Sequence, residues 1–208
     1  MTQKANIKRS VLHHVGITTG RIEIMVEWYG NVLGTKINFE KENPAANLNG
    51  VKGVWVTNDS ANHRIAIIGL PGLQSETSNA PRVGISHIAF EYDSLDDLLD
   101  TYVRLRDIDI TPVVSADQGD QGISIAFYYK DPDGNTVELT MDTLGDWDAS
   151  TEFMKTSLAF AEHPMGKYVD VDKMLEARSH GASSAELHER AYAGEFIPDY
   201  EMDASKLL

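Results

Sequence analysis

The sequence predicts an α+β fold in which two βαβββ modules form a curved, mixed β-sheet barrel around a cavity, followed by a helical C-terminal extension. The order strand, helix, three strands occurs twice within residues 10–142, and two stretches recur at nearly the same distance. From about Asp142 onward the chain becomes strongly acidic, with 14 acidic and 6 basic residues. We therefore divide the chain into modules at residues 10–70 and 82–142 and an extension at residues 143–208.

The first module opens with an apolar, β-branched stretch at residues 11–18, which predicts a strand. Apolar positions at helical spacing predict a helix over residues 22–33, and Gly34 stands where a C-terminal cap belongs. Three further strands are expected, at residues 35–40, 51–57 and 63–69. Residues 70–81, rich in Pro, Gly, Ser and Asn, predict a linker to the second module.

The second module repeats this order. A strand is expected at residues 83–92, and Ser94 then caps a helix that runs to about Arg106. We expect a strand at residues 108–114 and a loop at 115–121. The module closes with a hairpin over residues 127–141, whose turn holds Pro to fix φ and Gly to supply a positive φ.

The two modules can be aligned residue by residue. Residues 14–17 correspond to residues 87–90 at an offset of 73, and residues 63–67 correspond to residues 135–139 at an offset of 72. Near-equal offsets at opposite ends of the module indicate an internal duplication. His14 and His87 then occupy equivalent places, as do Ala66 and Glu138.

These equivalent places suggest a metal site. Glu138 is a carboxylate within an apolar strand, and a buried carboxylate needs a partner such as a metal ion. If the four places line one cavity, His14, His87 and Glu138 supply ligands and Ala66 leaves the fourth place empty. Two histidines and one carboxylate on one face are typical of non-haem iron(II) oxygenases. The alternative is that the histidines are structural and that Glu138 is an exposed strand residue. By strand alternation, His13 is expected to point away from His14 on the other face and to be structural.

Composition excludes several classes of partner. The formal net charge of −14 argues against nucleic acid and anionic membranes, and the absence of cysteine excludes disulfides and thiolate ligands. We see no signal peptide or membrane span and expect a cytoplasmic protein.

Helices are expected in the extension at residues 150–161, 172–180 and 183–193. We expect this extension to wrap the core or a partner subunit, and the chain to form a homo-oligomer.

The chain resembles the vicinal oxygen chelate superfamily, which includes glyoxalase I, bleomycin-binding proteins and type I extradiol dioxygenases. The resemblance covers residues 10–142 and is carried by four stretches: LHHVGI at 12–17, Trp28-Tyr29 with Leu33-Gly34, ISHIAF at 85–90, and DPDGNTVEL from Asp131.

Two further residues make the chain similar to small extradiol dioxygenases. His63 matches the acid–base residue that handles the catechol proton, and Tyr128 matches the tyrosine that hydrogen-bonds the substrate oxygen. The resemblance implies Fe(II), with Mn(II) as the alternative ion, and a catecholic substrate cleaved with O₂. The chain departs from the family in one loop, where a histidine is common and residues 118–121 contain none.

Two other functions remain open at this stage. A glyoxalase-like lyase or an epimerase would need a fourth protein ligand, and Ala66 cannot supply one. A non-enzymatic protein that binds a drug or metabolite would keep the fold without the ligand set. Metal content and dependence on O₂ separate the three hypotheses.

Overall fold

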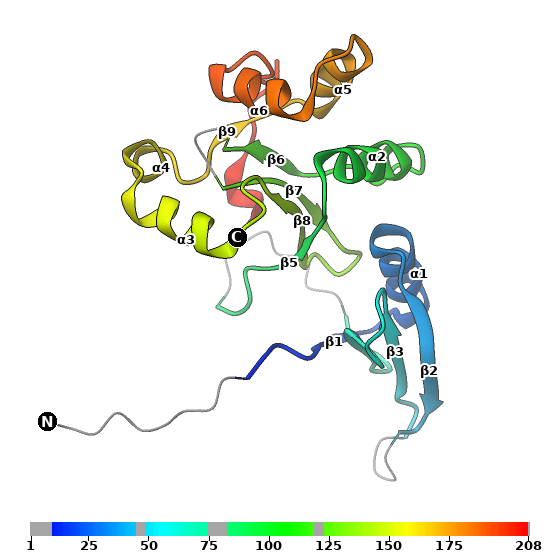
Figure 1. Ribbon diagram of the computed structural model, residues 1–208. Coiled ribbons are helices and arrows are strands. Elements are labelled where there is room, and N and C mark those ends of the chain that lie inside the picture. Colours follow the sequence, from blue (N-terminus) through cyan, green and yellow to red (C-terminus); the bar gives the residue numbers. More distant parts are fainter. Residues whose placement is uncertain (1–9, 45–48, 75–82, 119–122, 208) are drawn as a thin grey trace, which may run out of the picture. The chain divides into compact units, whose positions relative to one another are not determined.

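The computed structural model describes residues 10–44, 49–74, 83–118 and 123–207, and the chain divides into two compact units, Met1–Ser75 and Glu76–Leu208 (Figure 1). Each unit contains one βαβββ module, and the second unit also contains the C-terminal extension. The predicted α+β class and the paired modules are therefore confirmed.

The first unit is a four-stranded sheet with one helix. Its strands have the order β1-β4-β3-β2, in which β1 and β4 are parallel and the other pairs are antiparallel. The helix packs on β3 and β4 through a buried side that includes Met25, Tyr29 and Val32. The elements are β1 Val15–Thr19, α1 Ile22–Leu33, β2 Lys36–Glu42, β3 Lys52–Thr57 and β4 Ile65–Gly69.

The second unit repeats this topology and adds one strand. Its order is β5-β8-β7-β6-β9, again with one parallel pair, β5 and β8. The helix α2 packs against β8 on one face of the sheet, where the Tyr102 and Phe127 rings lie 6.0 Å apart. The elements of the module are β5 His87–Glu91, α2 Leu95–Arg106, β6 Val114–Asp117, β7 Ser124–Lys130 and β8 Thr136–Asp142.

Strand register confirms the internal duplication. Gly16 pairs with Ala66 in the first sheet, and Ala89 pairs with Glu138 in the second. These pairs are related by the offsets of 73 and 72 residues that the sequence predicts. In the described residues the strands form two sheets, each with its own edge strands, so hydrogen bonding does not close them into the expected barrel.

One strand lies later in the chain than predicted. The strand expected at residues 108–114 is instead β6, Val114–Asp117, within the stretch expected to be a loop. Asp109 takes a left-handed conformation with φ 61°, and the amide of Ile110 donates to the Leu105 carbonyl. This turn extends the end of α2, and Pro112, which has no amide hydrogen, follows it. Pairing therefore begins only at Val114.

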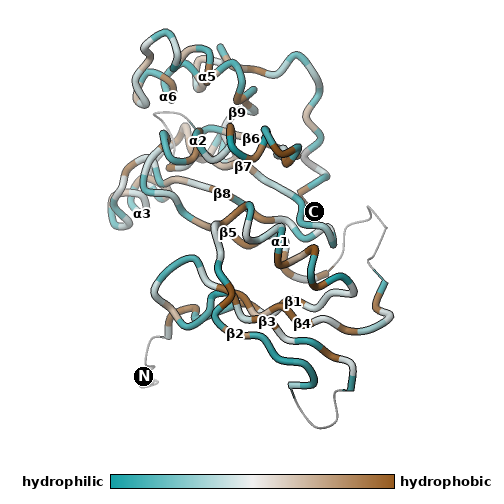
Figure 2. The backbone as a smooth tube through the Cα atoms, turned by 90° about the vertical axis from the view of Figure 1, so that its right-hand side faces the viewer, coloured by the Kyte–Doolittle hydropathy of each residue, from teal (hydrophilic) through white to brown (hydrophobic). Residues whose placement is uncertain are grey.

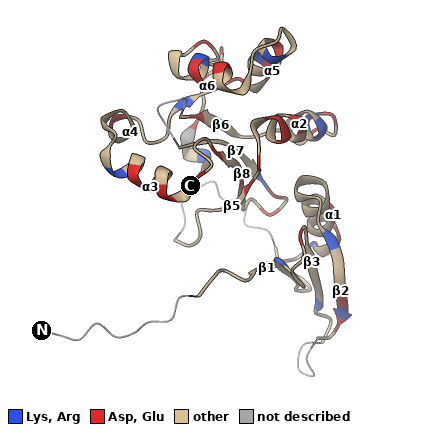
Figure 3. Cartoon of the chain, viewed as in Figure 1, with Lys and Arg blue, Asp and Glu red and all other residues tan. Residues whose placement is uncertain are grey.

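The extension packs on the second module through strand pairing and ion pairs. Its strand β9 pairs with β6, and its helix α5 is joined to α2 by Arg106–Asp172 at 2.6 Å and Arg178–Asp100 at 2.7 Å. Figure 3 shows charged residues of both signs on α2 and α5. A serine cap at Ser157 divides the helix expected at residues 150–161 into α3 and α4. The elements are α3 Trp147–Thr156, α4 Leu158–Glu162, β9 Lys167–Tyr168, α5 Val171–Ser179, α6 Ser184–Ala193 and the 3₁₀-helix η2 Ala204–Leu207.

Hydrophobic residues are distributed differently over the strands of the sheets and the helices of the extension. Brown, hydrophobic stretches occur along strands such as β1 and β3, whereas α5 and α6 are coloured largely in polar shades (Figure 2). Within the described residues, no helix combines the length and the apolar character that a membrane span requires.

Candidate active site

The second unit brings three predicted site residues together on adjacent strands. His87 opens β5, and Glu138 lies within β8, its parallel neighbour. Nε2 of His87 is 3.0 Å from Oε2 of Glu138. Tyr128 on β7 lies directly across from Glu138, and its ring centroid is 5.8 Å from that of His87. The three side chains therefore form one cluster on one face of the sheet.

Glu138 is a carboxyl group in a poorly solvated place. Its side chain is 11% exposed, and burial raises its pKa above the usual range. The neighbouring His87 and a hydrogen bond from the Tyr128 hydroxyl act in the opposite direction, but burial dominates. A carboxylate in such a place is stabilised by an adjacent cation, so this arrangement suits a metal ligand.

Tyr128 is a hydrogen-bond donor at this site. Burial, followed by the nearby charge of Glu138, raises the pKa of its hydroxyl group. The hydroxyl therefore keeps its proton at neutral pH and can donate it in a hydrogen bond to a carboxylate or to another oxygen.

The spacing of the donor atoms fits a metal ion. Ligand atoms about 2.1 Å from a metal and about 90° apart at its centre lie roughly 3.0 Å from each other. Nε2 of His87 and Oε2 of Glu138 have this separation. An imidazole and a carboxylate are also the donor types that Fe(II) and Mn(II) accept.

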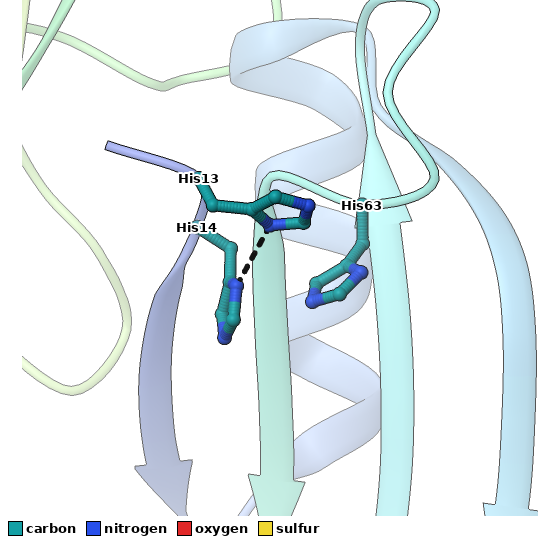
Figure 4. A group of neighbouring side chains, drawn as sticks. All are labelled: His13, His14 and His63. Carbon is teal, nitrogen blue, oxygen red and sulfur yellow. Dashed lines mark hydrogen bonds between the residues drawn. The ribbon is translucent and has the colours of Figure 1, made fainter. Parts of the chain in front are cut away.

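The first unit contains a second cluster, made of His13, His14 and His63 (Figure 4). The Nδ1 atoms of His13 and His14 are 2.9 Å apart, and the rings of His14 and His63 have centroids 4.3 Å apart. Ligand atoms of the three side chains all lie within 4.8 Å of one another. His14 and His63 precede the parallel neighbours β1 and β4, which explains why they meet.

The surroundings of His63 favour the neutral form of its ring, which can act as a base. Burial, followed by the charges of His14 and His13, lowers its pKa from the usual value. A lowered histidine pKa means that the ring loses its proton at a lower pH, so the neutral form that accepts a proton dominates at neutral pH.

Arg64 organises the backbone around this cluster. Its guanidinium Nε donates to Oδ2 of Asp59 at 2.8 Å, and its Nη1 donates to the carbonyl of His13 at 3.1 Å. The amide of Val15 donates in turn to the Arg64 carbonyl at 3.0 Å. These bonds hold the segment before β1 beside the segment before β4.

The sequence-based placement of His13 was wrong. Strand alternation predicts that His13 points away from His14, but β1 begins only at Val15 and both histidines precede it. Outside the paired strand no alternation applies, and the two rings make an edge contact at 5.1 Å.

The predicted site residues thus fall into two groups. His14 and His63 meet in the first unit, while His87, Tyr128 and Glu138 meet in the second. His14 lies in one unit and the His87–Glu138 pair in the other, and the joint ligand set of His14, His87 and Glu138 stays a prediction. Ala66, the counterpart of Glu138, is buried and offers no ligand atom.

The loop that lacks the expected histidine is closed by Gln118. Its side-chain nitrogen donates to the Pro164 carbonyl at 2.6 Å, and its side-chain oxygen accepts from the amides of Ile123 and Ser124. Residues 119–121 of this loop lie outside the described residues. Gln118 therefore has a structural role in joining β7 to the extension.

Sequence reasoning missed one buried ionisable pair. Nδ1 of His188 lies 2.8 and 3.0 Å from the two carboxylate oxygens of Asp117, and both side chains are buried. His188 carries no motif spacing, and Asp117 lies 71 positions away in a stretch expected to be a loop. The packing of α6 against β6 brings the two together.

Comparison with known proteins identifies the family. Residues 11–139 match the model of the Glyoxalase/Bleomycin resistance protein/Dioxygenase superfamily. The chain belongs to this superfamily. The resemblance inferred from the four sequence stretches is therefore confirmed.

Two curated relatives from Rhodococcus globerulus share about a third of its residues. The chain is 34% identical to Biphenyl-2,3-diol 1,2-dioxygenase 3 over 88% of its length and 89% of the relative. It is 33% identical to Biphenyl-2,3-diol 1,2-dioxygenase 2 over 89% of its length and 90% of the relative. Most of the extension is thus included in the similarity to both dioxygenases.

A solved structure supports the fold alone. A glyoxylase/bleomycin resistance protein/dioxygenase domain from Frankia sp. EAN1pec matches with a TM-score of 0.52 at 20% identity. The match covers 65% of this chain and 99% of that domain.

Proposed function

We propose that the protein is an Fe(II)-dependent extradiol dioxygenase, which cleaves a catecholic ring beside its two hydroxyl groups with O₂. The observation that carries this proposal is the His87–Glu138 pair with Tyr128 across from it, in a chain similar to two biphenyl-2,3-diol dioxygenases. In this proposal His14, His87 and Glu138 hold the iron, with Mn(II) as the alternative ion. Bound Fe(II) supplies Lewis acidity toward the diol and electron transfer to O₂.

His63 is the acid–base residue of the proposal. A catechol must lose a proton before its ring becomes electron-rich enough to react with O₂, and a neutral imidazole can accept that proton at neutral pH. The lowered pKa of His63 supports this role, because it favours the neutral ring that accepts a proton. General acid–base catalysis of this kind contributes on the order of 10²- to 10⁴-fold in rate.

Tyr128 is the orienting residue. Its hydroxyl remains protonated and can donate a hydrogen bond to a ring oxygen of the substrate. Fixing the ring in this way holds the diol and O₂ close together in a reactive geometry, which is the proximity contribution to catalysis.

The overall reaction balances without an external reductant. One C–C bond of the ring breaks, both atoms of O₂ enter the product, and a muconic semialdehyde forms. A glyoxalase-like or epimerase-like activity would not consume O₂, and the buried Ala66 in place of a fourth ligand argues against it.

The test is turnover by the iron-loaded enzyme. The chain is loaded anaerobically with Fe(II) and then mixed with O₂ and a panel of catechol, 3-methylcatechol and biphenyl-2,3-diol. We expect one O₂ consumed for each yellow product formed. Bound iron with no turnover of any catechol would refute the proposal, and turnover with Mn(II) alone would correct the metal.

A further inference from the structure

The two faces of the second sheet have different coverings. Phe127 and Tyr129 of β7 point to the face on which α2 packs, as the contact with Tyr102 shows. Ala126 and Tyr128 alternate with them and point to the opposite face. Glu138 lies directly across from Tyr128 and therefore shares that opposite face, which carries the candidate site.

The 3₁₀-helix η2 lies on the site face. Leu207 of η2 is 8% exposed and belongs to one buried cluster with Val114, Ala126 and Tyr128. Three partly buried side chains pack against the same cluster: Val113, Tyr168 and Met202. Apart from the two tyrosine hydroxyls, this cluster is apolar.

Two polar contacts fix this segment beside His87. The hydroxyl of Ser86 donates to the Leu207 carbonyl at 3.4 Å, and it also lies 3.4 Å from Nδ1 of His87. At the start of η2, Asp203 accepts from the amide and the hydroxyl of Ser205 at 3.0 and 2.6 Å, and these bonds lower the pKa of the Asp203 carboxyl group. The 3₁₀-helix is therefore capped at one end and held by Ser86 at the other.

We propose that Met202 and Leu207 form an apolar wall of the substrate site and determine which ring substituents the enzyme accepts. This inference rests on the proposed function, in which Tyr128 contacts the substrate. Leu207 belongs to the buried cluster that contains Tyr128, and its carbonyl accepts from Ser86 next to His87, so a ring held by the Tyr128 hydroxyl would lie near this side chain. An apolar wall favours alkyl- or aryl-substituted catechols over carboxylated ones, because a carboxylate would lose its hydration there.

The test compares substrates that differ only in substituent size. For each variant, kcat/KM is measured with catechol and with biphenyl-2,3-diol. The readout is the specificity ratio, which is kcat/KM for biphenyl-2,3-diol divided by kcat/KM for catechol. Leu207→Ala opens space, so the ratio should rise on the order of tenfold toward the larger substrate. Leu207→Trp fills space, so the ratio should fall by a similar factor.

Two controls separate specificity from folding. Leu158→Ala removes an apolar side chain of the same extension that is 80% exposed, and it should leave the ratio unchanged. The thermal midpoints of Leu207→Ala and Leu207→Trp, measured beside that of the unmodified enzyme, show whether both variants are folded. Protocatechuate, a carboxylated catechol, should be turned over much more slowly than 3-methylcatechol by the unmodified enzyme.

The outcomes are distinguishable. If the unmodified enzyme cleaves no catechol, the proposed function fails and this inference fails with it. If the unmodified enzyme is active but Leu207→Ala and Leu207→Trp change both substrates by the same factor, Leu207 is only structural and the inference alone is overturned. Opposite shifts of the ratio in the two variants support the wall.

Discussion

The two modules share a topology but differ in the chemistry they offer. The first unit presents three imidazoles at the ends of two parallel strands, with no carboxylate in the group. The second presents one imidazole, one carboxyl group and one phenol on the face of its sheet. Duplication therefore preserved the backbone positions while the side chains diverged.

The difference between the two modules has a physical basis in the residues that neighbour Glu138 and its counterpart Ala66. Glu138 is flanked by Tyr128, which donates a hydrogen bond, and by His87, which can carry a positive charge. Its counterpart Ala66 pairs with Trp55, which stands where Tyr128 stands in the second module and has no hydroxyl group. A carboxylate in a poorly solvated strand needs hydrogen-bonding or charged partners, and the Tyr128 hydroxyl is one that Glu138 has.

The largest expected effect comes from the carboxylate. Glu138→Gln keeps the shape of the side chain but removes the negative charge, and we expect iron affinity to fall on the order of 10²- to 10⁴-fold, the scale for removing one partner of a buried charge pair. Iron content after dialysis measures this loss, and activity should fall with it. Glu91→Gln, at an exposed position on β5, is the matched control. Full iron content in Glu138→Gln would show that the residue is not a ligand.

The second-largest expected effect concerns His63, and it distinguishes the proposed base from its neighbour His13. His63→Gln should keep bound iron but lower kcat by roughly 10²- to 10⁴-fold, because it removes the proposed base. His13→Gln, in the same cluster, should retain most of the activity and iron, since neither role is assigned to it. Stopped-flow measurement under single turnover checks the chemical step. An iron-free His63→Gln enzyme would mean that His63 is a ligand instead.

A third prediction concerns stability, and it sharpens the contrast because only the second unit contains the extension. His188→Ala removes one partner of the buried Asp117 pair and should lower the free energy of unfolding by on the order of 3 kcal/mol. Urea denaturation measures this change. His180→Ala, at an exposed position of the same extension, should change stability by much less. Equal losses in the two variants would show that the Asp117 pair does not anchor the extension.

Sequence reasoning found what repeats and missed what depends on tertiary pairing. The helix at residues 22–33 was predicted to the residue, because its apolar spacing and the cap at Gly34 are local signals. The equivalence of Ala66 and Glu138 followed from the repeat offsets. The orientation of His13 could not be predicted, since it depends on where the pairing of β1 begins.

Longer-range contacts were beyond the local signals. The Asp117–His188 pair joins residues 71 positions apart, and neither carries a motif that points to the other. The position of β6 depends on the left-handed turn at Asp109, which no glycine marks in the sequence. The cluster that holds both Leu207 and Tyr128 likewise appears only once η2 is placed on the sheet.

The smallest expected effect comes from removing the hydroxyl group of Tyr128. Tyr128→Phe removes one hydroxyl and keeps the ring, so the cluster with Leu207 stays packed and the fold is preserved. A hydrogen bond to a charged group contributes about 1.5–3 kcal/mol, and we expect kcat/KM to fall roughly 10- to 150-fold while iron stays bound. Tyr168→Phe, which removes a hydroxyl at the edge of the same cluster, is the matched control and should change kcat/KM less than threefold or so. If Tyr128→Phe loses iron rather than activity per bound iron, its hydroxyl supports the Glu138 carboxylate instead of the substrate, and the second unit would then hold a metal site without an orienting residue.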